Sequence, residues 1–220
     1  MCEFLSAIYT RTGAFYCIPE ETNSHSDIIK KFQLREGANS ENFVRLELTP
    51  QAWADVSTWR FKLDEKNAPS WWDEKKEDAE SAIRAKAQSH IIDKPVDECA
   101  NRFVILVEGG KIGSLKDGCV VVMIGGTIQY VCGGTIQYVR GGTIQHVYGG
   151  TIQYVRGGTI QCVDGGTIQC VDGGTIPAEI SGWSTIIVYG GNLPETIKDT
   201  AVVIDRRGAN SVCHTAGVTA

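Results

Sequence analysis

The chain has 220 residues, of which 42% are hydrophobic and 21% are charged, and its net charge is −5. This composition is typical of a soluble protein of one or two domains, and the acidic balance argues against a phosphate-binding surface, so no nucleic-acid partner is expected. No apolar run reaches about 18 residues and no secretion signal opens the chain, so we expect no membrane contact and a cytoplasmic location.

The first hundred residues combine strand-like and helical patterns. Strands are predicted where short runs alternate between apolar and polar residues. These runs are residues 3–10, 14–18, 42–48 and 59–63. A short helix is predicted over 24–32, with Ser24 or Ser26 as its N-cap, and a long exposed helix is predicted from Asp73 to about Ile91. The region therefore predicts a small α+β unit.

An eight-residue repeat follows. From Gly125 to Ile180 the chain reads GGTIQYVC, GGTIQYVR, GGTIQHVY, GGTIQYVR, GGTIQCVD, GGTIQCVD and GGTIPAEI. The same frame extends backwards in degenerate form through residues 101–124. In all ten octads the fourth residue is Ile or Val, and in nine the seventh is Val, Leu or Met, with Glu179 the exception. Because these two positions persist when the rest of the motif changes, we expect them to point into a core.

Each octad predicts a short strand and a glycine corner. Thr, Ile, Tyr and Val favour strands, whereas two glycines in every eight residues would destabilise a helix. Glycine at a corner permits positive φ and close approach of backbones. Stacked coils would pair their backbones about 4.8 Å apart and align identical side chains in ladders. The predicted fold class is therefore mainly β: an octapeptide-repeat β-solenoid with a small N-terminal α+β capping unit.

Two coil sizes fit the repeat, sixteen or twenty-four residues. At sixteen, Arg140 stacks on Arg156 and Tyr138 stacks on Tyr154, whereas at twenty-four Arg140 stacks on Asp164. Opposite charges are favourable neighbours and like charges are not. The charge pattern therefore inclines the prediction to twenty-four residues, while the possible tyrosine ladder leaves sixteen open.

Composition divides the chain into three parts. Residues 1–100 are predicted to form the α+β unit, 101–190 the solenoid and 191–220 a C-terminal cap. The octad frame is lost after the array, but apolar runs remain at 185–188 and 201–204. A solenoid has two open ends with unpaired strands, which invite aggregation unless they are covered. We expect each flanking region to cover one end.

The sixth and eighth octad positions vary while the others stay nearly constant. Constant positions build the fold, so the variable positions are expected to face solvent, as a recognition surface or as an ordinary surface under drift. Tyr and Arg, which are often central to interfaces, recur there. The predicted binding residues are Tyr130, Tyr138, Arg140, His146, Tyr148, Tyr154 and Arg156. The other variable positions of this stretch are Cys132, Cys162, Asp164, Cys170 and Asp172.

Eight cysteines are spread over the chain without any CxxC pair. Several replace Tyr, His or Arg at variable octad positions, so we expect free thiols in a reducing compartment. A metal site at Cys162 and Cys170, with His146 nearby, is the alternative, although its spacing fits no standard zinc pattern. Neither a metal nor another cofactor is therefore expected.

Two groups of residues contain side chains of types that can act in catalysis. Removal of the initiator Met would expose Cys2 as an N-terminal nucleophile, as in some amidotransferases, with His25 assisting. The N-terminal unit is short for such an enzyme and shows no obvious substrate loop. Four carboxylates flank Trp71 and Trp72, and they are expected to form a solvated surface and a helix N-terminus. These are Asp64, Glu65, Asp73 and Glu74. The chain is therefore predicted not to be an enzyme.

The opening MCEFLSAIYTRTG, the later SHSDIIKKFQL and NFVRLEL, and the GGTIQxV array together resemble a family found in phages and prophages of gut and soil bacteria. The likeness covers most of the chain and implies a viral or mobile-element origin. The family has no established activity. Small phage proteins outside the virion often disable host enzymes or immune systems. The resemblance thus suggests an anti-defence inhibitor or a sequestering protein in the host cytoplasm, whose partner is a host protein or a small signalling molecule.

A second resemblance concerns the repeat alone. Read from Val139, the octad is VRGGTIQY, a Val-x-Gly pattern that is similar to the triple-stranded β-helix of phage tail spikes. It implies an alternative function as a structural trimeric spike module. Pro177 and the frame change at the end of the array favour a single-chain solenoid instead, so we expect a monomer or a homodimer.

Overall fold

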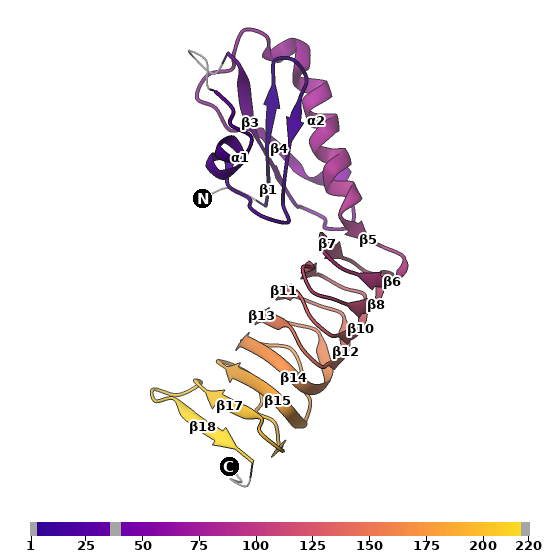
Figure 1. Ribbon diagram of the computed structural model, residues 1–220, viewed down its shortest axis with the longest axis vertical. Helices are drawn as coiled ribbons and strands as arrows, with labels where there is room; N and C mark the ends of the chain where they lie inside the picture. Colours follow the sequence, from indigo (N-terminus) through magenta and orange to yellow (C-terminus); the bar gives the residue numbers. More distant parts are fainter. Residues whose placement is uncertain (1–3, 36–40, 217–220) are drawn as a thin grey trace. The chain divides into compact units, whose positions relative to one another are not determined.

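The computed structural model describes residues 4–35 and 41–216, which form two compact units that divide between His90 and Ile91 (Figure 1). The first unit contains the α+β elements and the second contains a parallel β-solenoid of about seven turns. Within the described ranges, no helix is both long enough and apolar enough to cross a membrane. Each unit is described by itself below.

The first unit is built on a four-stranded antiparallel sheet. Its strands are β1 (Leu5–Thr10), β2 (Phe15–Tyr16), β3 (Phe43–Thr49) and β4 (Arg60–Leu63), in the order β2-β1-β3-β4. These four strands occur where alternation of apolar and polar residues predicts them. A short 3-10 helix, Val56–Thr58, precedes β4.

Two helices cover opposite faces of this sheet. Helix α1 (His25–Lys31) begins after Ser24, whose side chain accepts a hydrogen bond from the Asp27 amide; it packs its Ile28 with Ile8 and Phe43. Helix α2 (Trp72–Ser89) packs Trp72 against Phe61 on β4. Phe61 lies on the same face of the sheet as its cross-strand neighbours Leu48 and Leu5. Leu5 and Ile8 are three residues apart in one strand, so they point to opposite faces, and the two helices therefore cover opposite faces. The expectation of an exposed α2 is wrong for one side, which buries Ala79, Ile83 and Ala87.

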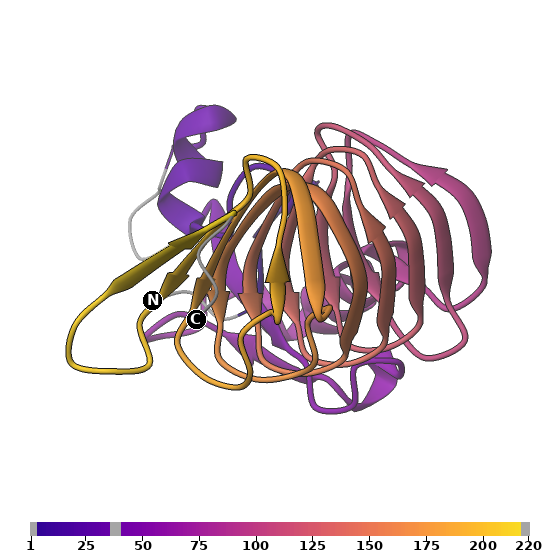
Figure 2. The same ribbon diagram turned by 90° about the horizontal axis from the view of Figure 1, so that it is seen from below.

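The solenoid consists of parallel strands that wind around one core (Figures 1 and 2). Its strands are β5 (Ile91–Ile92), β6 (Pro95–Cys99), β7 (Phe103–Leu106), β8 (Lys111–Leu115), β9 (Val120–Met123), β10 (Thr127–Val131), β11 (Thr135–Val139), β12 (Thr143–Val147), β13 (Thr151–Val155), β14 (Thr159–Val171), β15 (Glu179–Val188), β16 (Thr196–Ile197) and β17 (Val202–Asp205). They form two rows. The first row is β6, β8, β10, β12 and the first half of β14, and the second row is β5, β7, β9, β11, β13 and the second half of β14.

One coil contains sixteen residues. Thr127 pairs in register with Thr143, and Tyr138 pairs with Tyr154. The preference for twenty-four residues is therefore wrong, and Arg140 is followed in its column by Arg156 rather than by Asp164. The charge argument failed because exposed charges interact by no more than about 1 kcal/mol. Backbone ladders and core packing act in every coil and outweigh that difference.

The fourth and seventh octad positions point inward, as predicted. From Ile128 to Val171 these Ile and Val side chains are at most 1% exposed. The degenerate octads deviate in register. Val121, not the fourth-position Val120, aligns with Ile136, because the pairing of β9 shifts by one residue there. Likewise Leu106, not the seventh-position Val107, aligns with the inward Met123 of the next coil.

Glycine corners allow consecutive coils to approach closely. Gly158 has φ +73°, and a Cβ there would lie 2.7 Å from the Gly142 carbonyl oxygen of the coil before. At Gly157 a Cβ would lie 2.4 Å from the carbonyl oxygen of Arg140. The second glycine of each repeat is thus required by backbone conformation and by contact, and the first is required by contact, as the sequence predicts.

The solenoid extends further in both directions than the predicted residues 101–190. Parallel pairing begins at β5, and it continues beyond the array through β16 and β17. The last strand, β18 (Val212–Thr215), pairs with β17 in antiparallel orientation, where it covers the edge of β17. Each coil pairs with the next coil of the same chain.

Candidate functional site

The predicted binding residues lie on both rows of the solenoid rather than in a single patch. On the first row, Tyr130, His146 and Tyr148 form a stacked aromatic cluster. The ring centroid of His146 lies 5.4 Å from that of Tyr130 and 5.7 Å from that of Tyr148, and in both pairs the rings are within 20° of parallel. Tyr130 and Tyr148 are 42% and 51% exposed. This cluster ends at the next coil, where Cys162 follows His146 and donates a hydrogen bond to Asp164.

The second row carries the other four predicted residues. The rings of Tyr138 and Tyr154 stack with centroids 5.3 Å apart. Each tyrosine has an arginine two residues later, and the guanidinium carbon lies over the ring, at 5.5 Å for Arg140 and 5.8 Å for Arg156. We call Tyr138, Arg140, Tyr154 and Arg156 the tyrosine–arginine surface.

Cation–π contacts explain how two arginines share one column. The face of an aromatic ring attracts a cation, by about 0.5–1 kcal/mol at an exposed site. Each guanidinium is therefore held over its own ring, and the following coil adds Asp172 to the same column after Arg156. The surface thus presents aromatic and cationic groups in contact with one another, and these residue types often dominate protein interfaces.

Sequence reasoning missed exposed aromatic residues beyond the array. Trp183 is 85% exposed, and it lies beside Gly165 in register, where the glycine corners of the earlier coils run. Tyr189 and Arg206 of the next coil form another tyrosine–arginine contact, with the guanidinium carbon 5.7 Å from the ring centroid and a hydrogen bond from Arg206 to the Tyr189 hydroxyl. Their signal in the sequence was weak because the octad frame is lost there.

The cysteines in the described ranges are free thiols. Cys162 lies on the first row and Cys170 on the second, so the repeat separates the two residues considered for a metal site. Cys99 and Cys119 form a buried pair with sulfurs 2.7 Å apart. The hydrogen bond from Cys119, together with Arg102, holds the pKa of the Cys99 thiol below its ordinary value.

Cys17 is expected to be the least reactive of the partly accessible thiols. Burial raises the pKa of its thiol to about 12, although Lys86 lowers it in part. Only the thiolate reacts with iodoacetamide, so at pH 8 alkylation should be at least about tenfold slower at Cys17 than at the exposed Cys132 and Cys213. Peptide mass spectrometry over a time course measures this, and equal rates at the three positions would contradict it.

A polar cluster lies on the α1 face of the first sheet. The ligand atoms of His25, Glu47 and Asp64 lie within 4.8 Å of one another, and these residues are the one such group of three potential metal ligands in residues 4–35 and 41–216. Lys62 places its ammonium 3.0 Å from a carboxylate oxygen of Glu47 and 3.0 Å from one of Asp64. These hydrogen bonds, first to Glu47 and then to Asp64, raise the pKa of Lys62.

The predicted solvated surface of carboxylates is correct for only half of its members. Asp73 and Glu74 lie exposed in the first turn of α2. Asp64 belongs to the polar cluster, and the nearly buried Glu65 carboxylate forms an ion pair with Arg45 at 2.9 Å. The antiparallel pairing of β3 and β4 brings these groups together, and the linear sequence does not display that pairing.

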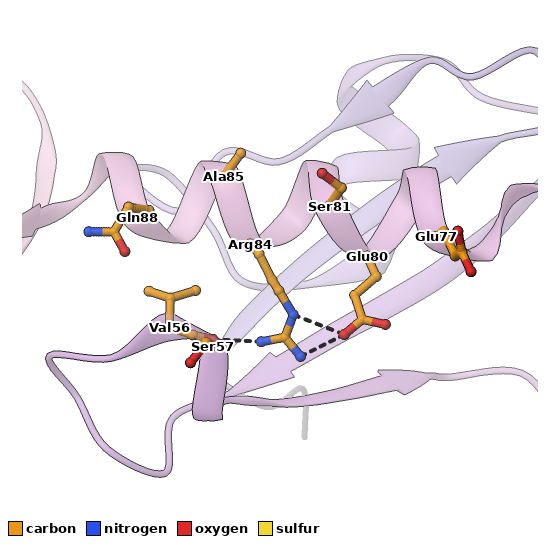
Figure 3. A pocket seen from close by; sticks show the side chains of 8 residues that line it. All are labelled: Val56, Ser57, Glu77, Glu80, Ser81, Arg84, Ala85 and Gln88. Carbon is orange, nitrogen blue, oxygen red and sulfur yellow. Dashed lines mark hydrogen bonds and ion pairs between the residues drawn. The ribbon is translucent and has the colours of Figure 1, made fainter.

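A pocket of about 590 Å³ lies between α2 and the segment before β4 (Figure 3). Arg84 is its central polar group, and its guanidinium donates to the carboxylate of Glu80 and to the carbonyl oxygens of Val56 and Trp59. Because these contacts join the helix to the neighbouring loop, they assign Arg84 a structural role.

Cys2, the considered nucleophile, lies outside the described residues. His25, which was expected to assist Cys2, is buried, and its Nε2 lies 2.9 Å from the carbonyl oxygen of Leu46.

Comparison with known proteins finds no matching family model, no matching curated protein and no matching solved structure.

Proposed function

We propose that the chain is a non-enzymatic binding protein, encoded by a phage, that binds and blocks a protein of its bacterial host. The observation that carries the proposal is the tyrosine–arginine surface, in which two stacked tyrosines each hold an arginine over the ring. The phage origin rests on the resemblance of the sequence motifs.

The chemistry of this surface favours a protein partner. Tyr and Arg are enriched among the residues that contribute most to protein interfaces. The aromatic rings offer apolar area at a low cost in side-chain entropy, because only two torsions are fixed. Arg140 and Arg156 add donors that recognise carboxylates in a bidentate manner. An acidic, aromatic-lined patch is therefore the expected counterpart.

A small signalling molecule fits this surface less well. Small ligands are usually enclosed in concave sites of about 300–1,000 Å³. The tyrosine–arginine surface lies on consecutive strands of a regular sheet, and Tyr154 is 39% exposed. The pocket between α2 and the segment before β4 belongs to the first unit instead. A protein partner is large enough to contact both coils that carry the tyrosine–arginine surface at once.

The test is a comparative capture from lysates of gut and soil bacteria. The bait is the full chain, either wild type or Tyr154→Ala/Arg156→Ala. A partner is a protein that is enriched on the wild type and lost from the variant, as quantified by mass spectrometry. With the purified partner, isothermal titration calorimetry should show affinity weakened by about tenfold or more, as expected when hot-spot residues are truncated.

The control is Trp183→Ala. It removes an exposed aromatic residue of the same unit, 85% exposed, which lies at the glycine corners rather than on the row that carries the tyrosine–arginine surface. The control should capture the partner as the wild type does. Equal losses in both variants, or no captured protein whose binding depends on Tyr154 and Arg156, would overturn the proposal.

A further inference from the structure

The polar cluster of the first unit is built like a metal site, and this inference is independent of the proposed function. Ser6, Glu47 and Lys62 are cross-strand neighbours on β1, β3 and β4, so their side chains share one face of the sheet. His25 reaches the same face from the start of α1, and Asp64 reaches it from the end of β4. Glu47 and His25 are 2% and 5% exposed, which is unusual for such polar groups.

We propose that His25, Glu47 and Asp64 bind a divalent transition-metal ion, for which the Lys62 ammonium is the competing cation.

The orientation of His25 supports a ligand role. A carbonyl oxygen only accepts hydrogen bonds, so Nε2 donates to Leu46, and Nδ1 faces Asp64, with 3.7 Å between Nδ1 and the nearer carboxylate oxygen. Metal-binding histidines commonly donate their second ring N–H to a carbonyl or a carboxylate, which fixes the ring and the tautomer. The ion would lie between Nδ1 and the two carboxylates.

The charges support a divalent ion at the same place. Glu47 and Asp64 contribute two negative charges, and the Lys62 ammonium contacts both carboxylates with a single positive charge. A divalent ion balances both. Lys62 can withdraw to solvent, since its side chain is 46% exposed. An imidazole with two carboxylates is a donor set that suits Mn²⁺ and Zn²⁺.

A further buried polar group, the Ser6 hydroxyl, lies next to Glu47 and has no hydrogen-bond partner among the described residues. Ser6 is 1% exposed. A buried hydroxyl without a partner is costly. A metal-bound water would give Ser6 that partner. Asp64 also lines a pocket of about 770 Å³, and its side chain is 39% exposed, so this carboxylate is accessible from solvent.

The experiment is a titration of the full chain with Mn²⁺, followed by the electron paramagnetic resonance signal of the free ion. Mn²⁺ is the probe because it prefers oxygen and nitrogen ligands, so the cysteines do not obscure the result. We expect the wild type to bind a single ion. His25→Ala and Asp64→Asn should each weaken binding by about tenfold or more. Lys62→Ala should bind more tightly than the wild type, because the competing ammonium is gone.

The controls remove the same residue types elsewhere, by His214→Ala and Glu98→Gln, and they should bind as the wild type does. Asp64→Asn is isosteric at a 39% exposed side chain, so it remains informative if His25→Ala does not fold, as judged by circular dichroism. The proposal is overturned if the wild type binds no Mn²⁺ up to about 1 mM, if binding survives Asp64→Asn, or if Lys62→Ala does not tighten it.

Discussion

Replacing Ile160 by aspartate is expected to abolish cooperative folding of the solenoid. Ile160 is fully buried at a fourth octad position, between Ile144 of the coil before and the following coil. Loss of the side chain alone should cost about 2–5 kcal/mol, and a buried carboxylate without a partner adds several more. Because each coil is stabilised by its neighbours, the defect should spread along the stack. Urea denaturation followed by circular dichroism measures the loss.

The adjacent residue provides the control. Gln161 is exposed on the same strand, one position further along. Gln161→Asp introduces the same carboxylate into solvent and should change the free energy of unfolding by no more than about 0.5 kcal/mol. If the two variants were equally stable, the inward assignment of the fourth octad position would be wrong.

Gly158→Ala is expected to lower the free energy of unfolding by about 1–3 kcal/mol, from backbone strain alone. The positive φ of Gly158 disfavours any residue with a Cβ, and the added methyl group would meet the carbonyl oxygen of Gly142 at 2.7 Å. That oxygen accepts the amide of Thr159 at 2.9 Å, so it cannot move without weakening the ladder between coils. Thermal and urea unfolding both report this loss.

Gly208→Ala is the matched substitution outside the array. A Cβ at Gly208 would meet only the carbonyl oxygen of Asn210, at 4.0 Å, and Gly208 has no positive φ. This variant should unfold as the wild type does. Tolerance of alanine at Gly158 would show that the coils can separate at their corners without losing stability.

Local patterns in the sequence were sufficient for several parts of the structure. The sheet and helices of the first unit follow from alternation and from the Ser24 cap. The inward columns follow from the persistence of two positions in every octad, and the glycine corners follow from the conformations that only glycine adopts freely. Where octads degenerate, as at Val120, the sequence placed the inward residue one position away from Val121, because a register shift leaves no local trace.

Other features depend on which segments meet in space. The sixteen-residue coil places Tyr138 beside Tyr154 and separates both from Tyr130 and Tyr148, and weak surface charges could not predict that choice. The polar cluster brings together His25, Glu47 and Asp64 from three separate segments, so no spacing in the sequence predicts it. The sequence by itself determined the repeat, its inward positions and its corners, because these depend on local conformation and burial. Only the tertiary structure decided which side chains stack and which carboxylates converge, because those contacts depend on the pairing of strands distant in the chain.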